Sequence, residues 1–294
     1  MKVLVSGANG LVGRAMTAHC MSEGSRVIAL DHVSLDITDE PGVNATIDRV
    51  RPDVVINCAA WTNVDGCELD PKRAQKANAR GPELLALACR RIDALLITIS
   101  TDYVFDGRKD GFYTQRDQPN PQSCYARSKL DGEHCAQQGW ARTIVVRSGY
   151  IFGPGGTNFL STVVRRALRG ERLRAINDSF GTPTYARDLA QQLYRLAQLD
   201  LPGIYHVVNS GEGASFESFA RAAIKAAGLA DTLVESISLE GLNRPAPRPR
   251  NSRLRCLLSE AVGLEPLPLL QDSLRDFVAA ESPAKAADIL RRSV

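Results

Sequence analysis

The sequence has no strong excess of charge of either sign: 36 Lys and Arg stand against 33 Asp and Glu over 294 residues, with a net charge of +3. Nucleic-acid-binding domains carry a concentrated basic surface, so this balance argues against nucleic acid as a partner. Long hydrophobic runs are also missing, since no stretch approaches the roughly 18 apolar residues of a membrane span, and no signal-peptide cleavage pattern follows Met1. We therefore expect a cytoplasmic protein that does not bind membranes.

Paired cysteine motifs are missing as well. The seven cysteines are odd in number and none of them form a Cys-x-x-Cys pair, which argues against a disulfide framework and against a zinc site. We expect reduced thiols and no bound metal. What the chain does have is length and 44% hydrophobic residues, enough to bury a large core in one large or two moderate domains.

The start of the chain reads as a strand, a glycine turn and a helix. An apolar run over 2–6 leads into Gly7-x-x-Gly10-x-x-Gly13, and apolar residues then recur at helical spacing. In this context the first glycine permits the tight turn, the second lets the backbone approach a pyrophosphate, and the third lets the helix pack on its strand. We prefer this interpretation to an accidental turn. The expected cofactor contacts are Gly7, Asn9, Gly10, Leu11, Val12, Gly13 and Arg14.

A second strand, over 26–30, ends in Asp31, which lies 18 residues beyond Gly13. An acid at about this distance typically binds the adenosine ribose and favours NADH. Arg14 favours NADPH instead, because a guanidinium can pair with a 2′-phosphate. The sequence therefore leaves NADPH or NADH open. Asp36 and Ile37, in a short loop, are expected to contact the adenine.

The third and fourth strands should bring further residues to the same edge of the sheet. The strand over 54–56 ends in small residues, and the carboxyl ends of parallel strands line ligand sites. A long helix, about 71–91, then precedes a strand over 94–99 that delivers Ser100 and Thr101. The expected cofactor contacts from these strand ends are Cys58, Ala59, Ala60, Thr62 and Ser100.

Tyr125 and Lys129 are four residues apart, so on a helix they share one face. A phenol that titrates at roughly 10 is a poor acid near neutrality, and a neighbouring ammonium favours its ionised form. Tyr125 could then protonate the oxygen of a carbonyl that accepts a hydride, while Thr101 holds that oxygen. The alternative is a surface Tyr–Lys pair, which the strand–turn–helix context disfavours.

The alternation of strands and helices weakens after a fifth strand over 143–147. We expect a nucleotide-binding domain of residues 1–147 plus about 181–208, and a smaller substrate-binding region of about 148–180 plus 209–294. A Pro- and Arg-rich stretch over 244–253 should be extended. Its arginines either bind phosphates or form a solvated basic loop, and the sequence does not separate these alternatives.

Six motifs follow one another in order: Gly7-x-x-Gly10-x-x-Gly13, the stretches 51–57 and 100–105, Tyr125-x-x-x-Lys129, and the stretches 176–184 and 248–254. Together they resemble the extended short-chain dehydrogenase/reductase superfamily and, within it, the dTDP-4-dehydrorhamnose reductases. The resemblance implies an α/β fold with a doubly wound parallel (Rossmann) sheet and a smaller C-terminal substrate-binding region.

The resemblance also implies an activity, the reduction of the C4 ketone of a nucleotide-activated 6-deoxy-hexulose. The implied substrate is dTDP-4-dehydro-6-deoxy-L-mannose, and the assembly we expect is a homodimer. Tyr125 would be the proton donor, Lys129 the ribose anchor and Thr101 the orienter of the ketone. The implied substrate contacts are Val64, Asp102, Tyr103, Tyr150, Asn158, Arg250 and Asn251.

Two positions depart from the pattern that the resemblance implies. Tyr150 stands where such reductases often carry a tryptophan, and the first helix begins Arg14-Ala15-Met16 where some relatives place a magnesium-binding carboxylate. We carry over no metal. Two alternatives remain: a non-catalytic regulatory subunit similar to the beta subunit of methionine adenosyltransferase, and a sugar-nucleotide epimerase or dehydratase.

Overall fold

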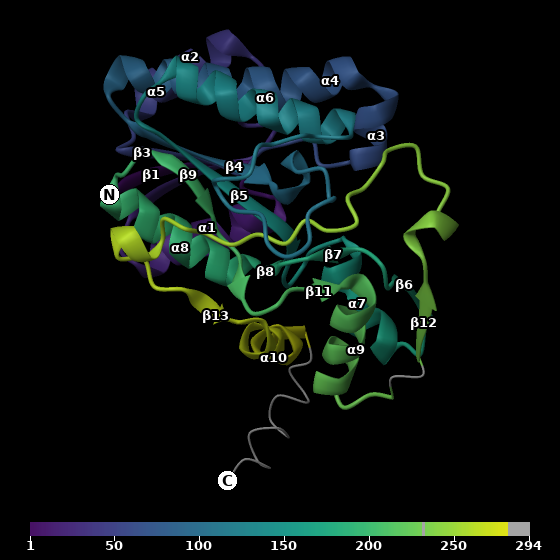
Figure 1. Ribbon diagram of the computed structural model, residues 1–294. Helices are drawn as coiled ribbons and strands as arrows, with labels where there is room; N and C mark the ends of the chain where they lie inside the picture. The colour runs from purple at the N-terminus through teal and green to yellow at the C-terminus, as the bar shows by residue number, and fades with distance from the viewer. Residues whose placement is uncertain (231–232, 282–294) are drawn as a thin grey trace.

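A seven-stranded, fully parallel sheet forms the centre of the computed structural model, which describes residues 1–230 and 233–281 (Figure 1). The strand order is β2-β1-β3-β4-β5-β8, with β9 beside β5. Because every pairing is parallel, each connection crosses over a face of the sheet. The strands are β1 (Lys2–Ser6), β2 (Arg26–Leu30), β3 (Val54–Asn57), β4 (Leu95–Thr101), β5 (Thr143–Phe152), β8 (Pro183–Tyr185) and β9 (Gly203–His206).

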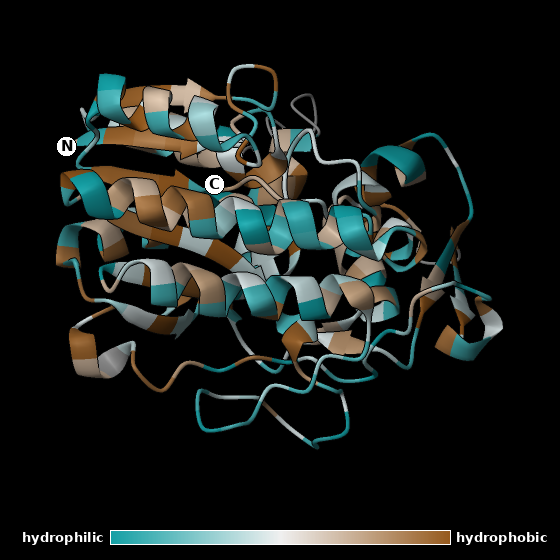
Figure 2. Cartoon of the chain, turned by 90° about the horizontal axis from the view of Figure 1, so that it is seen from above, coloured by the Kyte–Doolittle hydropathy of each residue, from teal (hydrophilic) through white to brown (hydrophobic). Residues whose placement is uncertain are grey.

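Helices cover both faces of this sheet, which confirms the doubly wound α/β fold that the sequence predicted (Figure 1). One face carries α1 (Leu11–Ser22) and α8 (Ala186–Leu199), and the other carries α2 (Glu40–Val50), α5 (Gly81–Ile92) and α6 (Cys124–Gly139). Figure 2 shows brown, hydrophobic strands between helices that turn teal sides outward. Burial of the apolar strand faces against these helices is the main stabilising term of such a fold.

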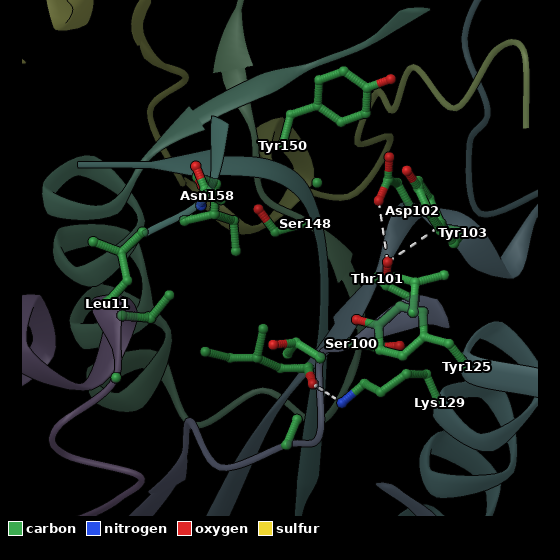
Figure 3. Close-up of a pocket in the computed structure, with 18 of the residues that line it drawn as sticks. Leu11, Ser100, Thr101, Asp102, Tyr103, Tyr125, Lys129, Ser148, Tyr150 and Asn158 are labelled. Atoms are coloured by element: carbon green, nitrogen blue, oxygen red, sulfur yellow. Dashed lines mark hydrogen bonds between the residues drawn. The ribbon is translucent and has the colours of Figure 1, made fainter. Parts of the chain in front are cut away.

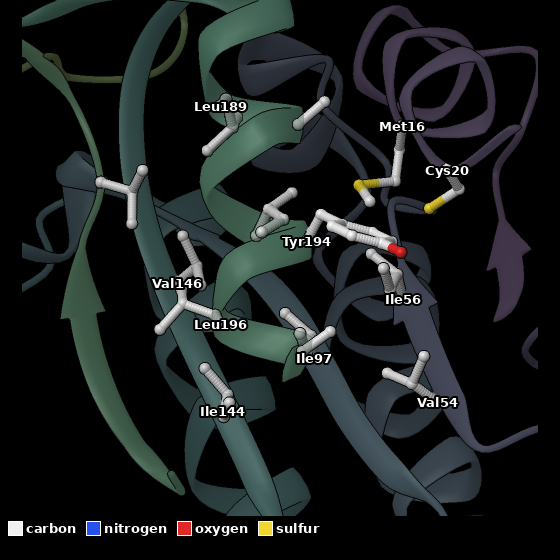
Figure 4. Packing of buried hydrophobic residues seen from close by; sticks show 14 of the residues in the cluster. Met16, Cys20, Val54, Ile56, Ile97, Ile144, Val146, Leu189, Tyr194 and Leu196 are labelled. Atoms are coloured by element: carbon white, nitrogen blue, oxygen red, sulfur yellow. The ribbon is translucent and has the colours of Figure 1, made fainter. Parts of the chain in front are cut away.

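The core between the sheet and α1 and α8 contains side chains from many parts of the chain (Figure 4). Ile97 of β4 and Ile144 of β5 pack there with Leu189 and Tyr194 of α8, and all four are at most 6% exposed. Residues far apart in sequence therefore depend on one another for burial.

Smaller elements gather beyond the carboxyl ends of the strands, around a second core that includes Phe152, Phe219 and Phe277. The helices here and before α5 are α3 (Val64–Leu69), α4 (Pro71–Gln75), α7 (Phe159–Leu168), α9 (Phe216–Ala226) and α10 (Leu270–Glu281). The short strands are β6 (Leu173–Ile176), β7 (Phe180–Gly181), β10 (Asn209–Ser210), β11 (Ala214–Ser215), β12 (Val234–Ile237) and β13 (Leu267–Leu269). The division into two functional units stays a prediction, and 282–294 lie outside the described residues. No helix in the described part of the chain has the length and hydropathy to cross a membrane.

The fifth strand is longer than the sequence indicated. Its first half pairs with β9 and its second half with β8, and the register shifts between Gly149 and Ile151. Tyr150 lies at this irregularity with φ +49°, in the left-handed region. Because both partner strands come from later in the chain, no local pattern could predict this extension.

The expected long helix over 71–91 is interrupted by a π-helical segment, Lys76–Arg80, between α4 and α5. Pro82 has no N–H to donate to the carbonyl of Asn78, four residues earlier, so the regular ladder cannot continue there. A Cβ at Gly132 of α6 would lie only 2.0 Å from that same carbonyl oxygen. The proline and the close approach of α6 together account for the interruption.

Candidate active site

Two adjoining cavities open at the carboxyl edge of the sheet. We call them the inner cavity, of about 440 Å³, and the outer cavity, of about 510 Å³. They share Gly10, Cys58, Ala59 and Ala60, so they form one continuous crevice. This crevice lies where the connections from β1 and β3 leave in opposite directions, which is the usual ligand position in a doubly wound sheet.

Most residues that the sequence singled out line this crevice. In the inner cavity these are Gly10, Leu11, Val12, Cys58, Ala59, Ala60, Thr62, Val64, Ser100, Thr101, Asp102, Tyr103, Tyr125, Lys129, Tyr150 and Asn158. In the outer cavity they are Gly7, Asn9, Gly10, Asp31, Asp36, Ile37, Cys58, Ala59 and Ala60. Gly13, Arg14, Arg250 and Asn251 line neither cavity.

The glycine turn leaves room for an anion at the start of α1. Gly7 has φ +66°, and a Cβ there would lie 2.7 Å from the backbone nitrogen of Ala59. A Cβ on Gly13 would lie 2.2 Å from the oxygen of Gly7, so this glycine keeps helix and turn in contact. Gly10 caps the helix without a side-chain hydrogen bond. No side chain caps the start of α1, and Gly10, Leu11 and Val12 line the inner cavity, which fits the pyrophosphate of a dinucleotide.

The outer cavity contains the acid at the end of β2. Asp31 accepts hydrogen bonds from Asn9 Nδ2 at 2.7 Å and from the hydroxyl of Ser34 at 2.7 Å, and the bond from Ser34 is the main cause that lowers its pKa. Arg14 donates instead to the carbonyls of Asn9 and Gly155, so its guanidinium does not line this cavity. The cations that do line it, Arg73 and Lys76, belong to α4 and the π-helical segment and were missed in the sequence.

Thr101, Tyr125 and Lys129 converge on the inner cavity, as the sequence predicted (Figure 3). Ser123 caps α6 by accepting a hydrogen bond from the Ala126 N–H at 3.2 Å, which starts the helix just before the tyrosine. The Lys129 ammonium donates to the carbonyl of Ile99 at 2.6 Å. Helix α6 and the end of β4 thus bring a phenol, an ammonium and a hydroxyl to one wall.

The pKa of Tyr125 moves in the direction opposite to the one we expected from Lys129. Burial raises the pKa of this phenol well above its ordinary value of 10, and only the hydrogen bond with Thr101 lowers it. Burial also lowers the pKa of Lys129 to about 8, against the opposing effect of Glu133. Desolvation is the largest cause of the pKa shift for both groups. Tyr125 is therefore held as a phenol with a proton to give.

A buried ion pair behind Lys129 was not foreseen. Glu133, one turn along α6, accepts hydrogen bonds from Arg147 of β5, from Nη2 at 2.6 Å and from Nε at 2.9 and 3.1 Å. It also accepts one from the Ser100 hydroxyl at 2.5 Å. The Arg147 and Glu133 side chains are 5% and 1% exposed. Glu133 thereby connects α6 to β4 and β5, one helical turn from Lys129. A lone Glu in a helix and a lone Arg in a strand give no sequence signal for such a contact.

Aromatic side chains form the wall of the inner cavity opposite α6. The Tyr150 hydroxyl lies 3.0 Å from Ser179 Oγ, and its ring packs against Phe216 with centroids 4.5 Å apart. Phe159 meets Phe216 edge-on at 6.0 Å. The two phenylalanines, which we did not single out from the sequence, extend the apolar surface that a tyrosine offers in place of a tryptophan. Ser148, also missed, lines the cavity with a hydroxyl that has no hydrogen-bond partner among the described residues.

The extended stretch 244–253 is used for internal contacts. Arg248 makes a two-pronged ion pair with Asp65 at 2.7 Å, and Arg250 pairs with Asp178 and Glu240. Asn251 donates to the carbonyls of Lys109 and Gly111. Arg248 is therefore paired with an acid of α3, and the more exposed Arg250 with acids of two neighbouring segments. Phosphate binding by this stretch stays a prediction.

No group of three or more His, Cys, Asp or Glu side chains is placed to hold a metal ion within 1–230 and 233–281.

Asn158 caps α7, with its side chain accepting from the Ser161 N–H at 2.9 Å and donating to the Ile151 carbonyl at 2.9 Å. Both the oxygen and the nitrogen of its amide therefore form hydrogen bonds with backbone groups at the edge of the cavity.

Comparison with known families gives a match over most of the chain. The model of the RmlD substrate binding domain matches residues 1–282. The chain belongs to this family. It is 38% identical to a dTDP-4-dehydrorhamnose reductase of Mycolicibacterium smegmatis, over 95% of this chain and 85% of that protein.

Solved structures agree with this assignment. A dTDP-4-dehydrorhamnose reductase from Clostridium acetobutylicum superposes with a TM-score of 0.91 at 35% identity, covering 96% of this chain and all of the other. The reductase from Bacillus anthracis, solved in complex with NADP, has a TM-score of 0.89 at 31% identity, covering 94% of this chain and 98% of the other.

Proposed function

We propose that this member of the RmlD family reduces the C4 ketone of a nucleotide-activated 6-deoxy-hexulose with NADPH or NADH. The substrate we favour is dTDP-4-dehydro-6-deoxy-L-mannose, whose reduction gives dTDP-L-rhamnose. The observation that carries the proposal is the convergence of Thr101, Tyr125 and Lys129 on a cavity that continues into the glycine turn. The names of the similar reductases supply the substrate class.

The proposed chemistry assigns one task to each side chain. A bound nicotinamide cofactor supplies the hydride. Tyr125 gives its phenolic proton to the ketone oxygen as negative charge develops there, and Thr101 stabilises that oxygen by a hydrogen bond. Lys129, held by the Ile99 carbonyl, binds the cofactor ribose and places a positive charge near the phenolate that forms. The aromatic wall of Tyr150, Phe159 and Phe216 covers the sugar.

The proposal includes a cytoplasmic location, which the seven free thiols support because reduced cysteines are typical of that compartment. The homodimer stays a prediction. For the cofactor, Asp31 supports NADH, whereas Arg73 and Lys76 are available for a 2′-phosphate. We therefore propose that both cofactors are accepted.

The experiment is a cofactor-oxidation assay with the dTDP-ketosugar, followed by absorbance. We expect stoichiometric oxidation by the wild type and a fall in kcat of about 10²–10⁴-fold for Tyr125→Phe, because the proton donor is lost. Tyr205→Phe is the matched control, since this buried phenol bonds to the Leu201 carbonyl away from the cavity. Unchanged turnover in Tyr125→Phe would remove the proposed acid. Product without net cofactor oxidation would indicate the epimerase or dehydratase alternative, and a stable complex with a synthetase without oxidation would indicate the regulatory one.

A further inference from the structure

Asp102 is a buried carboxyl beside the reacting groups, and the reaction proposed above gives it no task. It is the first residue after β4, it is 2% exposed, and it packs against Gly149, where a Cβ would lie 2.3 Å from the carboxyl carbon. Its two oxygens have separate partners. Thr101 Oγ1 bonds to Oδ1 at 3.1 Å, and Ser252 Oγ donates to Oδ2 at 2.5 Å (Figure 3 draws the first contact).

A count of hydrogens at Thr101 decides what this contact means. A hydroxyl has one hydrogen and two lone pairs. The Tyr103 N–H occupies one lone pair at 3.2 Å. If Asp102 is ionised, the single hydrogen of Thr101 goes to Oδ1, and none remains for a substrate oxygen. If Asp102 is neutral, its own proton bonds to the second lone pair of Thr101, and the threonine hydrogen becomes free to bind substrate.

The same count of hydrogens and lone pairs also determines where the phenolic hydrogen of Tyr125 can go. With a neutral Asp102, both lone pairs of Thr101 are occupied, so Thr101 no longer accepts a hydrogen bond from Tyr125. The phenolic hydrogen must then find another acceptor in the cavity. Two hydrogens, one from Thr101 and one from Tyr125, are thereby directed at a single oxygen of the substrate.

We propose that Asp102 is a positioning residue that acts in its neutral form, donating its proton to Thr101 and so directing the hydroxyl hydrogen of Thr101 at the substrate ketone. This inference rests on the proposed reduction, because the ketone is its acceptor. Ser252 completes the arrangement by holding Oδ2 as an acceptor, which leaves Oδ1 as the oxygen that carries the proton.

The surroundings of Asp102 support the neutral form. The titratable groups that face it are the phenols of Tyr103 in its own turn, Tyr125 of α6 and Tyr150 of β5, and burial raises the pKa of each. No Lys or Arg among the described residues forms an ion pair with it. Burial raises the pKa of Asp102 from 3.8 to about 7, against the hydrogen bonds that Ser252 and Thr101 donate to its ionised form. A carboxylic acid kept neutral near pH 7 in order to donate a hydrogen bond is a known catalytic arrangement.

The test uses Asp102→Asn, which has the same shape and offers a permanent donor to Thr101. We expect wild-type kcat/KM to fall about tenfold per pH unit above about pH 7, as Asp102 ionises. In Asp102→Asn this fall above about pH 7 should be absent, and kcat/KM at low pH should stay within about tenfold of the wild-type value. The kcat/KM of the variant should fall only as Lys129 titrates near pH 8. Ser252→Ala removes a hydrogen bond that lowers the pKa of Asp102, so the kcat/KM of this variant should begin to fall at a higher pH than in wild type.

A stability measurement reports on Asp102 without any activity. If the folded protein keeps the carboxyl protonated between about pH 4 and pH 7, where the unfolded chain has released that proton, wild type loses stability across this window as the pH rises. The Tm of Asp102→Asn should therefore rise relative to wild type by several degrees between about pH 4 and pH 8.

Three results would overturn the inference: an alkaline limb in Asp102→Asn identical to that of wild type, a folded Asp102→Asn that is inactive at every pH, or a Tm difference that does not change with pH. A wild type that oxidises no cofactor would instead remove the proposed function. The Tm series would still decide the protonation state of Asp102 in that case.

Discussion

Burial controls the chemistry of individual residues in this protein. The Glu133–Arg147 pair is almost fully enclosed, and it stands one helical turn from Lys129. An ion pair in such a place adds little net stability compared with apolar residues, because both charges have lost their hydration. Removing only one partner strongly destabilises the folded protein, because it leaves an unpaired charge in the interior.

Glu133→Ala should therefore lower the free energy of unfolding by about 3–5 kcal/mol, measured by urea denaturation. The control is the double substitution Glu133→Leu with Arg147→Met, which removes both charges and should lose much less. An equal loss in the single and double variants would show that packing, and not the unpaired Arg147, sets the cost.

At the scale of elements, the extended stretch 244–253 connects loops that follow different strands. Its arginine at 248 binds Asp65 at the start of α3, Asn251 binds carbonyls of the loop after β4, and Ser252 reaches Asp102. Backbone hydrogen bonds join Arg250 and Ser252 to Phe180 of β7. The stretch therefore fixes the loops that surround the inner cavity, although it lines neither cavity.

The Asp65–Arg248 pair gives a pH-dependent test of this connection. A double-mutant cycle with Asp65→Asn and Arg248→Ala should give a coupling of about 1 kcal/mol near pH 7, because the pair is two-pronged but Asp65 is 32% exposed. The hydrogen bond from Arg248 lowers the pKa of Asp65, so this stability is present above the ordinary value of 3.8 and is lost as pH falls through the lower folded value. Coupling that persists well below pH 3 would contradict the ion-pair explanation.

Over the whole molecule, one parallel sheet holds the two cavities in place. Ile97 lies in its centre, fully buried against α8, and Ile144 beside it packs on the same helix (Figure 4). The carboxyl end of the same strand, β4, carries Ser100 and Thr101. The packing of the core and the position of the site therefore depend on the same strand.

Ile97→Ala should lower the free energy of unfolding by about 2–5 kcal/mol, from lost burial and the cavity left behind. Val33→Ala is the control, because Val33 is 93% exposed and its truncation should change stability by no more than about 0.5 kcal/mol. Thermal or urea unfolding of both variants checks the prediction. A similar loss in the two variants would contradict the assigned core.

The sequence by itself determined the features that depend on near neighbours. Three features follow from spacings of a few residues: the glycine turn after β1, the strands over 26–30 and 54–56, and the shared helical face of Tyr125 and Lys129. These local patterns also placed the fold class and most of the crevice, because parallel strands bring their carboxyl ends to one edge whatever the distant chain does.

Only the tertiary structure decided the features that depend on distant residues. Partners from β8 and β9 set the length of β5 and the φ of Tyr150. Burial reversed the expected shift in the pKa of Tyr125. Ser252, 150 residues further along the chain, supplies the second partner of Asp102. Pairing and desolvation are properties of the packed molecule, so no short stretch of sequence specifies them.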